Sequence, residues 1–152
     1  MTEAQALALA SELAKPFEAL RLQPYHDPVG FPTIGWGHLL SRNAWAPLDQ
    51  WFKITPEDAD EILWRDMQRG LSAVVKLTSV PLALEQTAAL IDFCFNCGGG
   101  NYQASTLRQR VNDEDWEGAA GQFGRWVYAG AVRLPGLVRR RAAERDLFLS
   151  AS

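Results

Sequence analysis

Residues 17–38 read FEALRLQPYHDPVGFPTIGWGH, in which the end of an apolar helical pattern is followed by the signature of a β-hairpin. Glu18 belongs to the end of the helical pattern. Residues 27–30 are Asp-Pro-Val-Gly, and a type I turn favours Asp at its first position, Pro at its second and Gly at its fourth. We therefore expect two strands, at residues 23–26 and 31–34, joined by this turn.

Three polar side chains of this segment fit the chemistry of glycosidic bond cleavage. Two carboxyl groups from different elements can divide the work, since one protonates the leaving oxygen and the other assists a water molecule. Glu18 is expected to be the more desolvated and to act as the acid, and Asp27, at an open turn, as its charged partner. The Thr33 hydroxyl could hold a water on the far side of the sugar, which favours inversion. Spacing alone leaves another interpretation open, in which Asp27 is only a turn residue and Glu18 a surface acid.

Length and composition predict one globular domain. A chain of 152 residues can bury a full core, and 47% hydrophobic with 22% charged residues excludes a disordered protein. No apolar stretch approaches the roughly 18 residues of a membrane span. The first residues carry acids and lack a basic segment, so we expect no signal peptide or membrane anchor and a cytoplasmic location.

The formal net charge of −3 is unevenly distributed. Residues 1–100 hold 7 basic and 12 acidic side chains, and residues 101–152 hold 8 and 6. The basic C-terminal third could face an anionic polymer such as cell wall or nucleic acid, or simply be a solvated helix face. The overall acidity and the interruption of the arginines by Glu144 and Asp146 make nucleic acid an unexpected partner.

Cys94 and Cys97 form a C-x-x-C pattern inside an apolar helical run. No second C-x-x-C or histidine pair exists to complete a metal site, and helical i, i+3 spacing is wide for a disulfide. We expect two reduced core thiols, no metal and no cofactor.

The remaining pattern predicts a mainly α (α+β) protein. Apolar periodicity, capping residues and breakers predict helices at about residues 3–14, 55–77, 84–97, 105–111, 114–126 and 135–149. The one small antiparallel sheet lies near the N-terminus. Trp45 and Trp51, in the irregular stretch between sheet and helices, could stack on sugars or fill the core.

The spacing Glu-x8-Asp-x5-Thr, followed directly by Ile34-Gly35-Trp36-Gly37-His38, resembles the active-site segment of the phage-type lysozymes, the muramidase endolysins of tailed bacteriophages. The resemblance extends over almost the whole chain. Its further blocks are residues 55–59 with Asp66, residues 86–98 and 105–107, Trp126, and residues 136–145.

The resemblance implies a lysozyme-like fold and a lysozyme activity. Residues 1–152 would form a single lysozyme domain, with a small sheet-containing lobe at about residues 16–54 and a linking helix and larger helical lobe at about 55–152. The enzyme would hydrolyse the β-1,4 bond between N-acetylmuramic acid and N-acetylglucosamine in peptidoglycan and lyse the host cell. Glu18 would be the general acid, Asp27 would assist the water, and Thr33 would position it.

The resemblance also implies roles for residues around these three. The saccharide cleft would be lined by Leu39, Phe95, Ser105 or Thr106, and Gln122. His38 and Asp66 match an ion pair that ties the sheet lobe to the long helix. One arginine among Arg139, Arg140 and Arg141 would approach Glu18, and the sequence leaves that choice open.

The biology that the resemblance implies is that of an endolysin. A monomeric enzyme would wait in the host cytoplasm until a membrane-permeabilising holin releases it to act on the wall in the periplasm. The alternative from a different class is a non-catalytic peptidoglycan-binding or virion structural module that keeps the fold.

Overall fold

The computed structural model describes residues 2–151. The described chain forms two compact units. One contains the residues up to Phe17 and those from Met67 onward, and the other contains Glu18–Asp66. We call them the helical unit and the hairpin unit and describe each separately.

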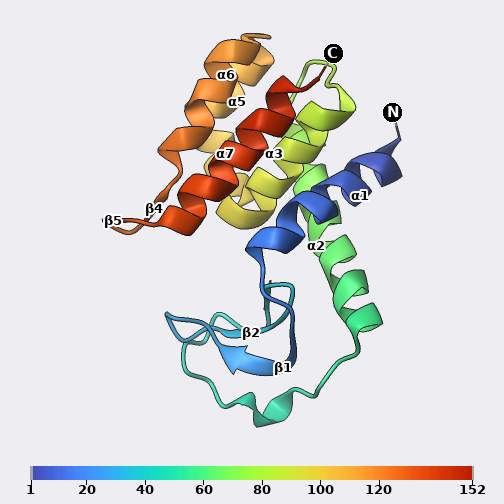
Figure 1. The fold of residues 1–152 in the computed structure, drawn as a ribbon, viewed down its shortest axis with the longest axis vertical. Coiled ribbons are helices and arrows are strands. Elements are labelled where there is room, and N and C mark those ends of the chain that lie inside the picture. Colours follow the sequence, from blue (N-terminus) through green and yellow to red (C-terminus); the bar gives the residue numbers. More distant parts are fainter. Residues whose placement is uncertain (1, 152) are drawn as a thin grey trace. The chain divides into compact units, whose positions relative to one another are not determined.

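The hairpin unit is built on a three-stranded antiparallel sheet in the order β1-β2-β3. Figure 1 labels the first two of these strands. The strands are β1 (Arg21–His26), β2 (Pro32–Gly35) and β3 (His38–Leu39). The predicted hairpin is confirmed, and the Gly30 N–H donates to the Asp27 carbonyl at 2.9 Å as its turn requires. The sequence analysis missed β3, because two residues are too few for a period-2 pattern.

Glu18 does not lie on a helix, contrary to expectation. Helix α1 spans Glu3–Ala14, and a 3-10 turn, η1 (Lys15–Phe17), follows it. Glu18 comes directly after η1. Pro16 explains the difference, because a proline lacks an N–H and crowds the preceding turn, so the α-helix ends before it.

Helix α2 (Pro56–Leu77) begins at the predicted cap. The Asp58 N–H donates to Thr55 Oγ1 at 3.1 Å, and the Thr55 N–H donates to the Asp58 carboxylate at 3.0 Å. This reciprocal capping fixes where the helix starts. Between β3 and α2 the chain is irregular apart from the short 3-10 helix η2 (Leu48–Gln50).

The helical unit is centred on α3 (Leu84–Cys97), which packs against both α1 and α7 (Pro135–Leu149). Figure 1 shows α7, in red, beside α3. Around them lie α4 (Gly99–Ala104), α5 (Thr106–Asn112) and α6 (Trp116–Gln122). The core of this unit is apolar, with Phe93, Tyr102 and Phe123 fully buried in edge-to-face ring contacts.

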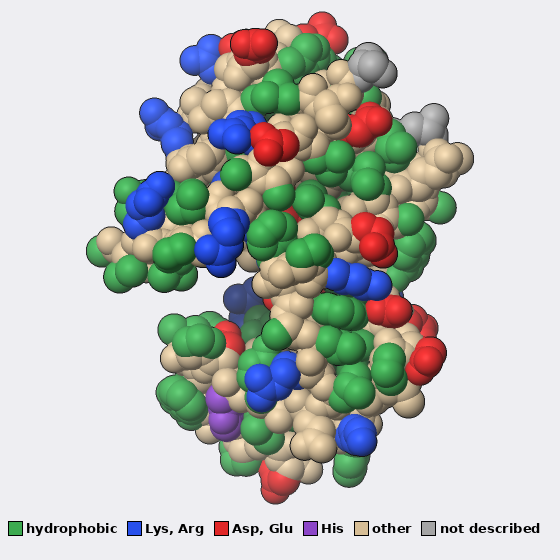
Figure 2. Space-filling model, in the orientation of Figure 1, with side chains coloured by type: hydrophobic (Ala, Val, Ile, Leu, Met, Phe, Trp, Pro, Cys, Tyr) green, Lys and Arg blue, Asp and Glu red, His purple; other side chains and the backbone are tan. Residues whose placement is uncertain are grey.

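The helix expected at residues 114–126 is shorter in the structure. The Asp115 carboxylate caps α6 by accepting from the Gly118 N–H at 3.0 Å, so the helix begins at Trp116. After the 3-10 turn η3 (Phe123–Arg125) comes an unpredicted hairpin of β4 (Tyr128–Ala129) and β5 (Val132–Arg133). Figure 2 shows hydrophobic and basic side chains at the surface in this part of the helical unit.

Both cysteines are reduced, as predicted, but only Cys94 is fully buried and Cys97 is partly exposed. Burial raises the pKa of Cys94 to about 12 and that of Cys97 to about 11. Both thiols therefore stay protonated at neutral pH. Among residues 2–151 there is no cluster of three or more metal-binding side chains, and no helix is both long and apolar enough to cross a bilayer.

Two side-chain contacts tie the sheet to α2 within the hairpin unit. His38 Nδ1 lies 2.7 Å from Asp66 Oδ2, and the Trp36 indole N–H donates to Asp60 at 2.9 Å. The His38 and Asp66 side chains are only 25% and 11% exposed. Removing the shielded Asp66 partner should therefore cost more than removing a partner in water.

The Asp66→Ala variant should lower the free energy of unfolding by about 2 kcal/mol, because a largely buried hydrogen bond to a charged group is lost. The matched control is Glu61→Ala on the same helix, which removes the 2.6 Å contact with Arg65 between side chains that are both more than 60% exposed. Apart from the change in helix propensity, that control should lower the free energy of unfolding by at most about 0.5 kcal/mol. Urea unfolding of both variants measures the difference, and equal losses would show that the His38 contact stabilises nothing.

Candidate active site

The Glu18 carboxyl group lies against Gly37, the glycine between Trp36 and His38. Gly37 has a positive φ of 76°, and a Cβ atom built on it would overlap the Glu18 carboxyl group. Glycine is thus required here twice, by its backbone conformation and by the close approach of the carboxyl group. The sequence analysis quoted Gly37 only as part of the matching segment, since a glycine in a sequence does not show what lies above it.

The Asp27 carboxylate is held by the turn that it heads. Its Oδ1 accepts hydrogen bonds from the Val29 N–H at 3.0 Å and the Phe31 N–H at 2.8 Å. Asp27 is therefore a turn residue, as the alternative interpretation of the sequence proposed. Among residues 2–151 no group donates a hydrogen bond to its second oxygen, so the turn role and a chemical role are compatible.

Thr33 lies in β2 and is only 5% exposed. Its hydroxyl donates to the Phe31 carbonyl at 2.8 Å. Because the one hydroxyl proton is used there, the Thr33 oxygen can only accept a hydrogen bond from a further group such as water.

Tyr25 connects these residues and was not singled out from the sequence. It pairs with Thr33 across β1 and β2, and the Arg21 guanidinium lies 4.4 Å from its ring centroid. Burial and the negative charges of Glu18 and Asp27 raise the pKa of Tyr25, while Arg21 opposes this. Both acids thus lie close enough to Tyr25 to act on it, and the phenol stays protonated at neutral pH.

The residues expected to contact saccharide fall into both units. Leu39, in β3 of the hairpin unit, is half-buried. In the helical unit Phe95 and Gln122 are half-buried and Thr106 is exposed. Ser105 is 4% exposed and its hydroxyl both accepts from the Arg108 N–H and donates to the Tyr102 carbonyl, so capping α5 already uses it.

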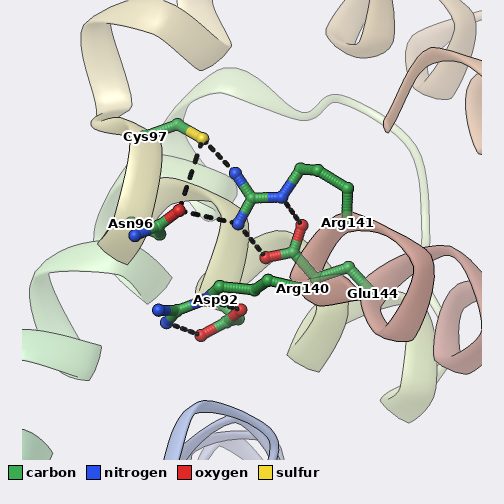
Figure 3. A network of polar contacts seen from close by, with 6 residues as sticks. All are labelled: Asp92, Asn96, Cys97, Arg140, Arg141 and Glu144. Carbon is green, nitrogen blue, oxygen red and sulfur yellow. Dashed lines mark hydrogen bonds and ion pairs between the residues drawn. The ribbon is translucent and has the colours of Figure 1, made fainter. Parts of the chain in front are cut away.

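The consecutive arginines of α7 have different environments (Figure 3). Arg139 is exposed, whereas Arg140 and Arg141 are 3% and 1% exposed. Arg140 donates two hydrogen bonds to Asp92 on α3, at 3.0 and 2.7 Å, and its guanidinium lies over the rings of Phe17 and Phe95. The approach of one of these arginines to Glu18 stays a prediction.

Arg141 binds inside the helical unit. Its guanidinium contacts both oxygens of Glu144, at 2.7 and 2.8 Å, and donates to Asn96 at 2.8 Å and to the Cys97 sulfur at 2.5 Å. Figure 3 shows these side chains converging from α3 and α7. Each strongly buried cation therefore has an anionic partner, which offsets the cost of removing it from water.

The pKa values of the two buried carboxyl groups, Asp92 and Glu144, depend on each other. Burial opposes ionisation of Asp92, but hydrogen bonding and the positive charges of Arg140 and Arg141 hold its pKa below the ordinary value. Burial and the neighbouring Asp92 charge raise the pKa of Glu144 well above its ordinary value.

Comparison with known proteins gives a consistent result. The phage lysozyme family model matches residues 15–144. The endolysin of Acyrthosiphon pisum secondary endosymbiont phage 1 is 34% identical over 143 residues, covering 91% of this chain and 94% of that protein. The solved endolysin from Escherichia coli O157:H7 phage FAHEc1 has a TM-score of 0.82 at 32% identity and covers 93% of this chain and 91% of its own.

A second solved structure, the muramidase domain of SpmX from Asticaccaulis excentricus, has a TM-score of 0.80 at 35% identity, covering 98% of this chain and 97% of that one. These likenesses confirm the predicted fold class, a mainly helical lysozyme-like fold with small antiparallel sheets.

The coupled carboxyl pair predicts the pH dependence of the Glu144→Gln variant. Because the folded protein raises the pKa of Glu144, the stabilisation from its proton is complete below about pH 4.5 and is lost as the pH rises through the raised pKa. Glutamine is neutral at every pH and can still donate to Asp92. The free energy of unfolding of the variant, relative to that of the parent protein, should therefore increase as the pH rises from about 4.5 to about 8. Urea unfolding of both proteins at several pH values measures this difference.

The control for this titration is Asp146→Asn, also on α7 but with a side chain 70% exposed. Its free-energy difference from the parent should vary little over this pH range, because an exposed side chain has nearly the same surroundings in the folded and unfolded protein. A constant difference for Glu144→Gln over the same range would contradict the coupled pair.

Proposed function

The chain belongs to the phage lysozyme family and is therefore a lysozyme that degrades peptidoglycan, and from this premise we propose which residues cleave which bond. The substrate bond is the β-1,4 link between N-acetylmuramic acid and N-acetylglucosamine. Glu18 is the general acid, Asp27 is the base, and Thr33 orients the attacking water. With lysozyme activity following from the family, the alternative of a non-catalytic module is set aside.

The observation that supports this assignment most is the grouping around Tyr25 in the hairpin unit. Both Glu18 and Asp27 act on the pKa of Tyr25, and Thr33 pairs with Tyr25 across the sheet. The unit thus gathers two carboxyl groups and one oriented hydroxyl, which are the groups that acid-catalysed hydrolysis by water needs.

The proposed reaction is a single displacement. Glu18 donates its proton to the glycosidic oxygen as the bond to the anomeric carbon breaks. A water that donates one hydrogen bond to Thr33 attacks that carbon from the opposite face and gives its proton to Asp27. Transfer of a proton from Asp27 back to Glu18 through solvent restores the enzyme, and the product has the inverted anomeric configuration.

The hydrogen bonds at Asp27 suit this role. Two backbone N–H groups bind one carboxylate oxygen and fix the side chain, while the other oxygen can take the proton from water. Thr33 is fixed in the same way, because its proton is committed to Phe31 and its oxygen must accept. Release by a holin, action in the periplasm and a monomeric state stay predictions of the resemblance.

The released fragments test the assignment. Wild-type protein should liberate muramic acid reducing ends that are initially in the α configuration, as NMR of fresh products would show. Glu18→Gln should lower the rate of release by at least about 10³-fold, because the variant cannot donate a proton to the leaving oxygen. Initial β products would exclude inversion, glucosamine reducing ends would exclude a muramidase, and full activity of Glu18→Gln would exclude Glu18 as the acid.

Gly37→Ala should reduce the rate of wall lysis by about 10²-fold, because the new methyl group displaces the Glu18 carboxyl group by an ångström or more. The control is Gly130→Ala. Gly130 also has a positive φ, of 61°, but nothing lies within 4 Å of the added methyl group. Turbidity clearance of wall suspensions compares the two, and equal effects would mean that backbone strain, not contact with Glu18, causes the loss.

A further inference from the structure

Trp45 is exposed. The sequence left open whether this residue fills the core or stacks on sugars, and its exposure excludes the core. Its relative exposure is 65%, so it does not fill the core. It lies in the irregular stretch of the hairpin unit, where Phe52 is also exposed, at 81%. Figure 2 shows hydrophobic side chains at the surface of this unit. A large exposed indole needs an explanation, since burial is the ordinary way to stabilise it.

The indole is exposed but firmly held. It lies directly against Gly30, where an added Cβ would overlap its ring. The backbone N–H of Trp45 donates to the Gly30 carbonyl at 2.7 Å, which holds the two residues together. The His26 ring packs at 5.2 Å between centroids, and its Nε2 lies 2.7 Å from the Ala46 carbonyl oxygen. The contacts on one side leave the ring oriented and the remainder open to solvent.

The backbone of Trp45 is unfavourable for its residue type. Its φ is 62°, in the left-handed region that bulky side chains rarely adopt. Glycine or asparagine would fit this position better. Such backbone strain is found preferentially at binding and catalytic sites.

The position of Trp45 links it to the proposed chemistry. Gly30 is the last residue of the turn headed by Asp27, and its N–H donates to the Asp27 carbonyl at 2.9 Å. The Asp27 side chain binds the N–H groups of Val29 and Phe31 on either side of Gly30. The indole therefore packs against the same turn that fixes Asp27, the proposed base.

The chemistry of the exposed indole fits a sugar ring. A pyranose presents a face of C–H groups that packs on a flat aromatic surface, and tryptophan contributes strongly to binding for little lost side-chain freedom. The Trp45 Nε1 has no hydrogen-bond partner among residues 2–151 and is free to donate to a hydroxyl or N-acetyl oxygen.

We propose that Trp45 is a stacking platform for an N-acetylated sugar of the peptidoglycan strand, which extends the substrate site along the hairpin unit beyond the Asp27 turn. This inference rests on the proposed function. Trp45 is a binding residue in it, and takes no part in proton transfer.

The experiment measures binding separately from cleavage. Soluble, uncross-linked peptidoglycan strands that retain their stem peptides are titrated into Glu18→Gln protein by calorimetry. Adding Trp45→Leu should weaken binding by about five- to tenfold, because leucine preserves an apolar contact with Gly30 and the same backbone strain but offers no flat face. Adding Trp45→Phe, which restores a flat ring, should keep the affinity within about threefold.

The control is Phe52→Leu in the same Glu18→Gln background. Phe52 is an exposed aromatic residue of the same unit, without the contact to the Asp27 turn, and its loss should change affinity less than twofold. Equal binding by the Trp45→Leu and parent proteins would overturn the inference about Trp45 but leave the proposed function intact. No binding by the Glu18→Gln parent would contradict the proposed function and the inference with it.

A second measurement observes Trp45 itself and needs a variant at this position only to assign its signal. In Glu18→Gln protein labelled with 5-fluorotryptophan, the ¹⁹F resonance of Trp45, assigned by its absence in Trp45→Phe, should shift on addition of the strands. An unmoved resonance would overturn the inference even if Trp45→Leu failed to fold.

Steady-state kinetics distinguish a residue that binds the sugar from a residue that only positions Asp27. With active protein, a platform predicts that Trp45→Leu raises KM about five- to tenfold and changes kcat less than twofold. A fall in kcat at unchanged KM would instead make Trp45 a positioning residue for Asp27 and overturn the proposal.

Discussion

The hairpin unit depends on one short turn and the carboxylate that caps it. By accepting two backbone N–H groups, Asp27 satisfies donors that no strand partner reaches, and this fixes the register in which Tyr25 faces Thr33. A slip of one residue would turn every side chain of β1 to the other face of the sheet. The grouping of the two acids around Tyr25 therefore follows from the turn rather than from contacts among the acids themselves.

The helical unit depends on a different interaction, the charged cluster between α3 and α7. Removing two guanidinium groups from water is costly, and the structure offsets that cost with matched hydrogen bonds to Asp92, Glu144 and Asn96. Loss of one partner from such a buried pair costs on the order of 3–5 kcal/mol, because the other charge is left buried without compensation. The cluster thus specifies how α7 is rotated and positioned along α3, which an apolar contact alone defines poorly. Its bonds to Arg140 also fix the cation that lies over Phe17, the residue before Glu18.

Most of the fold could be predicted because its boundaries are set by local chemistry. The sequence predicted α1, α2, α3 and α7 to within one residue of the bounds that the structure has, since Thr55, Gly98 and Pro135 mark helix ends through local chemistry. The shortened α6 and the hairpins of two-residue strands escaped prediction, because their signals are weaker than the helical periodicity around them. The catalytic candidates could be proposed from spacing and resemblance. Neither the influence of both acids on Tyr25 nor the position of Gly37 against Glu18 could be recognised, since both depend on which side chains meet in space.

Two of the glycines in the hairpin unit, Gly30 and Gly37, explain why its groups lie so close together. Gly30 allows the Trp45 indole, and Gly37 the Glu18 carboxyl group, to approach the backbone nearer than any side chain would permit. Each also has a positive φ, so replacement is unfavourable in conformation as well as in space. Side chains held directly against the backbone of the connections between strands have less freedom than side chains held by other side chains, whose rotamers add their own motion. The unit thus achieves a fixed arrangement of the proposed acid, the proposed base and the exposed indole with few buried apolar residues, and its precision comes from backbone hydrogen bonds and absent Cβ atoms.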